Sequence, residues 1–152
     1  MATMVLKGGV VLKVKDIMTP DVIGVREFET VEVAARTLEH YNIGAMPVYG
    51  LGGLVSGMIT DRDMVTRCIA ANREPSKTTV AQIMTNRLTA VTPDTDVIAA
   101  AELMAKHQVR RLPVIEAGKL CGMISLKDLV VRTETAENAT NALIKISENI
   151  TK

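Results

Sequence analysis

An internal repeat constrains this chain more than any other feature of its sequence. The segment Val14–Thr19 (VKDIMT) recurs as Val80–Thr85 (VAQIMT). Further along, Gly57–Asp63 (GMITDRD) recurs in the same order as Gly122–Asp128 (GMISLKD). Matches at a nearly constant separation indicate two copies of one structural unit, each too small to bury its own apolar faces. The chain is therefore predicted to be a tandem repeat.

The repeats and their flanking segments divide the chain into four parts. We predict a first repeat over residues 13–69, a linker over 70–79, a second repeat over 80–132 and a C-terminal amphipathic helix over 133–152. Helices and sheets are stable only when packed in layers around a shared core. The two copies are therefore expected to form a single α/β (α+β) domain over residues 1–152, with approximate twofold symmetry.

Local patterns predict the order β-α-β-β-α in each repeat. Short β-rich runs occupy residues 22–25 and 88–91, and apolar residues at helical spacing cover 31–41 and 97–107. A second helix should open at Thr60 or Ser125. The intervening strands and turns are expected over residues 46–49, 50–53 and 54–59 in the first repeat, and over 112–115, 116–119 and 120–124 in the second.

Several residues are expected to fix where the helices begin and where the strands lie in the sheet. Thr30 is a candidate N-cap for the first long helix, and either Thr95 or Asp96 for its counterpart. Pro47 and Pro113 lie within predicted strands. Because proline has no N–H to donate, we expect each of these strands to lie at a sheet edge or to start at its proline.

The C-terminal segment has the pattern of an amphipathic helix. We expect it to pack on the body of the domain or on a second subunit. The apolar residues at helical spacing are Ala136, Ala139, Leu143, Ile146 and Ile150.

Composition and charge exclude several classes of protein. Of the 152 residues 47% are hydrophobic, which is too many for a disordered chain, but only 2% are aromatic. The net charge is +1. A nucleic-acid binder needs a basic face and often stacking aromatic residues, so no nucleic-acid partner is expected. No apolar run approaches the length of about 18 residues that a membrane span needs, so we predict no membrane contact and a cytoplasmic location.

Two cysteines, Cys68 and Cys121, have no second Cys or His nearby at a metal-ligand spacing. No metal is therefore expected. Two reduced, buried thiols are favoured, although the sequence leaves a disulfide open.

The Gly57–Asp63 motif and its counterpart have two interpretations. Thr60-x-x-Asp63 and Ser125-x-x-Asp128 fit a capping box in which Asp replaces Glu. The same geometry suits a ligand, because a helix N-terminus offers free N–H groups to an anion. A carboxylate one turn into the helix can accept two hydrogen bonds from a ribose diol, and the glycine allows close approach of the backbone.

These features together resemble a cystathionine-β-synthase (CBS) domain pair, also called a Bateman module. They are the tandem units, the Ile-Met-Thr openings, the Met-Pro-Val and Leu-Pro-Val segments, and the paired Gly-x-x-Thr/Ser-x-x-Asp motifs. The resemblance covers residues 13–132. It implies that one turn serves both as a cap and as a ribose site.

The resemblance implies binding of an adenine nucleotide (AMP, ADP or ATP) or S-adenosylmethionine in clefts between the two repeats, without a metal. The ribose-binding residues would be Thr60, Asp63, Ser125 and Asp128. The base is expected to rest near Val22, Ile23 and Pro47 in one site and near Leu88, Thr89 and Pro113 in the other.

The phosphate-binding candidates are Arg110, Arg111, Lys127 and Arg62. The first repeat has Gly44-Ala45 at the positions of Arg110-Arg111, so the two sites should be unequal. The resemblance implies that the Asp63 site faces the basic residues of the second repeat, which makes it the candidate for a phosphorylated ligand. The Asp128 site would favour a less anionic ligand or stay empty. Alternatively, the arginine pair is a solvated pair near a helix end, where cations are favoured in any protein.

No catalytic group stands out, so the protein is not expected to be an enzyme. The favoured hypothesis is a regulatory sensor that changes conformation on binding an adenosyl ligand and signals to an unknown effector protein. The resemblance also implies a homodimer. The alternative is a ligand-independent dimerisation or interaction scaffold with vestigial clefts.

Overall fold

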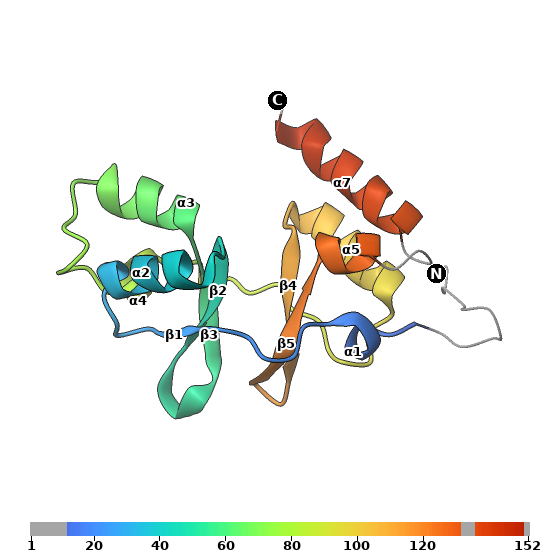
Figure 1. The fold of residues 1–152 in the computed structure, drawn as a ribbon, viewed down its shortest axis with the longest axis horizontal. Coiled ribbons are helices and arrows are strands. Elements are labelled where there is room, and N and C mark those ends of the chain that lie inside the picture. The colour runs from blue at the N-terminus through green and yellow to red at the C-terminus, as the bar shows by residue number, and fades with distance from the viewer. Residues whose placement is uncertain (1–11, 132–135, 151–152) are drawn as a thin grey trace. The chain divides into compact units, whose positions relative to one another are not determined.

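The computed structural model describes residues 12–131 and 136–150 (Figure 1). The chain forms two compact units, one made by Val22–Leu88 and the other by the chain before and after that segment. The opening helix of each repeat therefore belongs to the unit that contains the body of the other repeat. The mixed helix and strand composition confirms the predicted fold class.

The unit formed by Val22–Leu88 contains a sheet with the strand order β1-β2-β3. β1 (Val25–Arg26) runs parallel to β2 (Ala45–Tyr49), and β2 pairs antiparallel with β3 (Val55–Thr60). A short turn of 3-10 helix, η1 (Leu51–Gly53), joins β2 to β3. The turn and both longer strands lie where the sequence predicts them, to within a residue.

Helix α2 in this unit has the bounds that the sequence predicts. Its start is fixed by Thr30, whose hydroxyl accepts a hydrogen bond from the N–H of Val33 at 3.2 Å. Its end is fixed by Asn42, which adopts the left-handed conformation (φ 51°). The helices of this unit are α2 (Val31–Tyr41), α3 (Asp61–Asp63), η2 (Met64–Ile69) and α4 (Val80–Ile83). The core side chains are Val25, Val31, Ala34, Leu38, Met46, Val48, Ile59, Met64, Cys68, Val80 and Ile83.

The second unit is built around an antiparallel pair, β4 (Arg111–Glu116) and β5 (Lys119–Ser125). Ala117 (φ 51°) and Gly118 (φ 78°) occupy the turn, and positive φ at both central residues is the type I′ geometry that suits a two-residue hairpin. The helices are α1 (Val14–Ile17), α5 (Val97–His107), α6 (Leu126–Val131) and α7 (Ala136–Ile150).

Asp96, not Thr95, is the N-cap of α5. The Asp96 Oδ1 atom accepts a hydrogen bond from the N–H of Ile98 at 2.8 Å. The Thr95 hydroxyl accepts instead from the N–H of Thr92 at 3.0 Å, which shapes the turn before the helix.

Pro47 does not place its strand at a sheet edge, and that prediction is wrong for β2. Met58, opposite Pro47 on β3, exchanges both backbone hydrogen bonds with Thr85 (2.9 Å each). In an antiparallel pair both residues at such a position direct their backbone groups away from each other. The nitrogen of Pro47 therefore faces β1, and its lack of a hydrogen removes no hydrogen bond between β2 and β3.

The prolines instead shorten the neighbouring strand. In the second unit the N–H of Val91 donates to the carbonyl of Pro113 (3.1 Å), and the carbonyl of Val91 accepts from Ile115 (2.8 Å). The next acceptor along this parallel ladder, the carbonyl of Thr89, would need an N–H at position 113, where proline has none. The strand predicted over residues 88–91 is therefore only a bridge at Val91.

The same geometry explains why the strand predicted over residues 22–25 begins only at Val25. Val25 pairs with Val48, so the carbonyl of Ile23 faces the missing N–H of Pro47. The ladder stops at both prolines. As a result, the chain just before Val25 and just before Val91 is not part of a sheet.

Helix α7 lies across α5 and α6 (Figure 1). It buries Ala142 (4% exposed) and Ile146 (3% exposed), whereas Leu143, expected on the buried face, is 44% exposed. The facing side chains of α5 are small, Ala101 and Ala105, and a close helix approach favours alanine over leucine. For packing on the body of the domain, the prediction for Leu143 is therefore wrong by one position. Ala136, Ala139 and Ile150 lie outside the residues whose side chains are described.

The sequence of α5 explains why α7 packs on this repeat. The groove beside α7 is lined on α5 by Ile98, Ala101 and Ala105, together with the charged residue Glu102. In α2 the positions that correspond to Ile98 and Ala105 are Glu32 and Glu39, and Glu32 forms an exposed ion pair with Arg36 at 2.8 Å. An apolar helix face would not be buried favourably against such charges.

Each opening segment completes the sheet and core of its unit. The backbones of Thr19 and Met123 exchange hydrogen bonds of 2.8 and 2.9 Å, as those of Thr85 and Met58 do. The opening helices also fill the cores, because Val14 and Val80 are fully buried. Neither repeat body therefore forms a complete unit from its own segment of sequence.

The two motif glycines are required by these same bridges. A Cβ atom at Gly57 would lie 2.6 Å from the carbonyl oxygen of Thr85, and one at Gly122 would lie 2.7 Å from that of Thr19. Real Cβ atoms do not approach so closely. Sequence reasoning attributed these glycines to the approach of a ligand, whereas the space beside them is filled by the protein's own backbone.

Cys68 is a buried free thiol, as the sequence favours, whereas the free thiol Cys121 is only partly buried. Within residues 12–131 and 136–150, no helix combines the length and the apolar character needed to cross a membrane.

Candidate functional site

The first candidate turn joins β3 to α3. The Thr60 hydroxyl accepts a hydrogen bond from the N–H of Asp63 at 3.0 Å, and Asp63 Oδ2 accepts one from the N–H of Thr60 at 3.0 Å. These two bonds form the predicted capping box. They fix the side chain of Asp63 at the start of the helix, and the residue as a whole is only 9% exposed.

The second candidate turn, which joins β5 to α6, has the same design. Asp128 Oδ2 accepts hydrogen bonds from the N–H and the hydroxyl of Ser125, at 2.7 and 3.0 Å. The N–H of Asp128 donates in return to the Ser125 hydroxyl at 3.3 Å. The interpretation of both motifs as capping boxes is therefore confirmed.

Each capping box uses one oxygen of its carboxylate. In both residues it is Oδ2 that accepts the backbone N–H. Within the described part of the chain, no hydrogen bond to Oδ1 of Asp63 or of Asp128 is present. A carboxylate oxygen carries two acceptor sites, so each turn retains capacity for hydroxyl donors.

A shared backbone bond ties each turn to the strand beside it. The N–H of Asp61 donates to the carbonyl of Gly44 at 3.0 Å, and the N–H of Leu126 donates to that of Arg110 at 2.9 Å. The residue after each cap is thereby held at the start of β2 or β4.

Three of the four predicted phosphate ligands gather near the second turn. Arg111 pairs with Ser125 across β4 and β5, Arg110 precedes it, and Lys127 lies in the first turn of α6. Arg110 and Lys127 are exposed, and Arg111 is partly buried. Arg62 is exposed on α3 beside the first turn. That the three cations serve a ligand held by Asp63 stays a prediction.

The predicted base contacts lie where the ladders end. Pro47 and Pro113 are buried in β2 and β4. The other four precede Val25 or Val91 and are partly buried: Val22, Ile23, Leu88 and Thr89. Within the units, the ladder geometry places Pro47 beside Ile23 and Pro113 beside Thr89. That a base binds there stays a prediction.

Tyr49 is a neighbour of this region that sequence reasoning missed. Its ring occupies the space beside Gly24, so that any side chain at position 24 would collide with it. Burial raises the pKa of the Tyr49 hydroxyl above its ordinary value. The sequence signal for this close contact was Gly24, which lies directly before the β-branched strand residue Val25.

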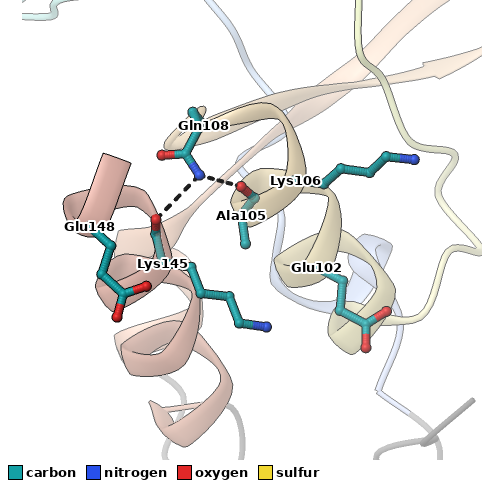
Figure 2. A pocket seen from close by; sticks show the side chains of 6 residues that line it. All are labelled: Glu102, Ala105, Lys106, Gln108, Lys145 and Glu148. Atoms are coloured by element: carbon teal, nitrogen blue, oxygen red, sulfur yellow. Dashed lines mark hydrogen bonds between the residues drawn. The ribbon is translucent and has the colours of Figure 1, made fainter. Parts of the chain in front are cut away.

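A cleft of about 390 Å³ lies between α5 and α7 (Figure 2). The side-chain amide of Gln108 closes one end by donating to the carbonyls of Ala105 and Lys145. The charged side chains around it are two acids and two bases, and those of Lys106 and Glu102 point away from the amide (Figure 2). None of the residues predicted from sequence lines this cleft: Glu102, Ala105, Lys106, Gln108, Lys145 and Glu148 do.

The described residues contain no group of three or more His, Cys, Asp or Glu side chains arranged to hold a metal ion.

Comparison with known proteins identifies the repeats. The family model described as "CBS domain" matches residues 14–69 and again residues 80–133. The chain belongs to the CBS domain family. Proteins built from such pairs are regulatory modules.

One relative of this CBS pair is the CBS domain-containing protein YhcV of Bacillus subtilis (strain 168). It is 39% identical over 134 residues, which cover 88% of this chain and 94% of the relative. This CBS pair thus resembles a protein of nearly its own length.

Two solved structures share the fold of this CBS pair. Hypoxic Response Protein I, in a crystal structure with two coordinated zinc ions, has a TM-score of 0.74 and 32% identity, covering 80% of this chain and 98% of that chain. The CBS domain pair of protein MJ0100, in complex with 5′-methylthioadenosine and S-adenosyl-L-methionine, has a TM-score of 0.71 and 26% identity. The second match covers 80% of this chain and 95% of that chain.

Arg67 is a further residue near the first turn of this CBS pair that sequence reasoning did not single out. Its Nε atom lies 3.8 Å from Asp63 Oδ1, one helical turn away. The i, i+4 spacing of Asp63 and Arg67 was the available signal.

Proposed function

We propose that this CBS pair is a non-catalytic sensor for an adenosyl compound, in which Asp63 and Asp128 accept hydrogen bonds from ribose hydroxyls. The observation that carries the proposal is the state of the two carboxylates. Each is held by a capping box through Oδ2, while Oδ1 keeps its acceptor capacity. A fixed carboxylate with an oxygen that can still accept suits a diol, because it loses little conformational freedom on binding.

The surroundings of the turns support an adenosyl ligand rather than an unphosphorylated sugar alone. Arg110, Arg111 and Lys127 would provide cations for phosphates or a carboxylate. Because Pro47 and Pro113 end the ladders, the backbone carbonyls before Val25 and Val91 are released from the sheet. Such carbonyls can accept the hydrogen bonds that an amino group on a purine donates.

The output of the sensor would be conformational. A ligand shifts the population of two states only by its differential affinity for them. We propose that the change is passed to an effector protein and that the chain acts as a homodimer in the cytoplasm. The competing hypothesis is an interaction scaffold that binds no nucleotide.

A ligand panel separates the sensor from the scaffold. Thermal unfolding with millimolar AMP, ADP, ATP or S-adenosylmethionine is expected to show a higher midpoint for at least one compound. Ligand at a hundredfold excess over its Kd stabilises the native state by about 2.7 kcal/mol. The matched control is the same concentration of GTP or inorganic phosphate. Unchanged midpoints with all four adenosyl compounds would favour the scaffold.

Substitution of the two aspartates tests the ribose assignment. The substitutions Asp63→Asn and Asp128→Asn each retain an oxygen for the cap but remove the charge. We expect each to weaken binding of the compound found in the panel by about tenfold or more, with the larger loss at Asp63. Calorimetric titration measures both values.

The control for these variants is Asp61→Asn, because Asp61 is exposed on the same helix. It should bind the compound at least as tightly as the wild type. Equal losses at Asp63 and Asp128 would contradict the proposed asymmetry. A purely structural capping role would lower stability in both variants without changing the affinity.

A further inference from the structure

Arg67 connects the first turn to the opening helix of the second repeat. Its Nη1 atom donates to the carbonyl of Ile83 at 3.1 Å and lies 3.3 Å from that of Met84. Its Nε atom faces Asp63 Oδ1 at 3.8 Å. One guanidinium thus contacts the candidate ribose carboxylate and the last carbonyls of α4 at the same time.

The contact of Arg67 with the carbonyls at the end of α4 lies next to the sheet. Helix α4 ends at Ile83, and the next residues, Met84 and Thr85, lie against β3. Thr85 exchanges two backbone hydrogen bonds with Met58, two residues before the cap Thr60. The contacts from the Asp63 carboxylate through Arg67 to Thr85 therefore end at β3, the strand that leads into the first candidate turn.

We propose that Arg67 is a positioning residue, which holds the Asp63 carboxylate toward a ribose diol and couples that carboxylate to the segment after α4. The part that concerns ribose rests on the proposed function above. The coupling does not, because it is a property of the protein without ligand.

The geometry explains the choice of arginine. At 3.8 Å the contact with Asp63 is an ion pair that leaves Oδ1 able to accept hydroxyl hydrogens. The side chain of Asp63 is 13% exposed, so a nearby cation offsets the cost of burying its charge. A guanidinium has separate N–H groups for the carboxylate and the carbonyls, whereas a lysine ammonium is a single point charge.

The coupling is tested without any ligand by amide hydrogen exchange. The probes are the N–H of Thr60, bonded to Asp63, and the N–H of Thr85, bonded to Met58. The exchange rate of each probe is divided by that of amides in β2, so that a change in global stability cancels. We expect Arg67→Met to speed exchange at both probes by about tenfold relative to β2. The N–H of Thr60 is bonded to the carboxylate that the guanidinium faces, and Thr85 directly follows the two residues whose carbonyls the guanidinium binds.

A double-mutant cycle decides whether the two probes are coupled through Arg67. Asp63→Asn is expected to speed exchange at Thr85 in the wild-type background but not in the Arg67→Met background. Arg73→Met is the matched control, because Arg73 is exposed in the same unit. If Asp63→Asn leaves Thr85 unchanged in both backgrounds, the coupling is refuted.

The ribose part is tested with ATP and 2′,3′-dideoxy-ATP as probes. Arg67→Met should weaken binding of ATP by about tenfold and leave that of the dideoxy compound unchanged, since only the diol uses Asp63. Equal losses of affinity for ATP and for the dideoxy compound would show that Arg67 has only a general structural role. If the wild type binds neither probe nor any compound of the panel, the proposed function fails, while the exchange experiment still decides the coupling. Arg67→Lys provides a milder variant if Arg67→Met does not fold, and it is expected to restore at most one of the two contacts.

Discussion

Alanine at Gly57 is expected to destabilise the protein by about 3 kcal/mol, because its Cβ atom would overlap the backbone of Thr85. That Cβ atom would lie 2.6 Å from the Thr85 carbonyl oxygen, and the atom that must move is main chain rather than the flexible end of a side chain. The bridge between Thr85 and Met58 would have to shift or break. The equivalent substitution at Gly122, 2.7 Å from the carbonyl oxygen of Thr19, should have a similar cost.

Urea unfolding followed by circular dichroism measures both free energies. Gly44→Ala is the control, since a Cβ atom there would approach nothing closer than 3.4 Å. Its effect should stay within about 0.5 kcal/mol. A Gly57→Ala variant as stable as the wild type would show that the bridge is not tightly packed against β3.

The substitution Ile146→Asp should release α7 from α5 and α6. Ile146 is 3% exposed, and replacing it removes apolar contacts and buries a charge, with an expected cost of about 3 kcal/mol. Ile144 on the same helix is 51% exposed and provides a matched control. Ile144→Asp should change stability by less than about 0.5 kcal/mol.

Limited proteolysis and urea unfolding together distinguish these variants. In Ile146→Asp, cleavage within α7 should precede cleavage elsewhere, whereas Ile144→Asp should behave as the wild type. Equal protease sensitivity in the two variants would show that α7 is not held through the face that contains Ile146.

The long helices were predictable because their boundaries are local. Thr30 and Asp96 cap the two helices through their own side chains, and Asn42 and Gln108 end them in the left-handed conformation. Capping depends on residues within one turn, which a sequence shows directly. The capping boxes at Thr60 and Ser125 were predictable for the same reason.

The strand positions were less predictable because they depend on distant partners. Whether Pro47 must lie at an edge depends on which neighbour its missing N–H would have faced, and that neighbour is set by tertiary pairing. The register of α7 likewise depends on the small side chains of α5, which favoured Ala142 over Leu143 at the contact. Arg67 was missed because its carbonyl partners, on Ile83 and Met84, are remote in sequence.

The exchange of opening segments has a consequence for how the chain folds during synthesis. When the first repeat has left the ribosome up to residue 79, the core position of Val80 is still empty and β3 still lacks Thr85 as a neighbour. Conversely, Val14 and Thr19 are made before the second repeat, but the backbone partner of Val14 is Thr95 and that of Thr19 is Met123 on β5. Order in synthesis and order in assembly therefore differ, because the segment around Thr19 must wait for β5 before its unit closes.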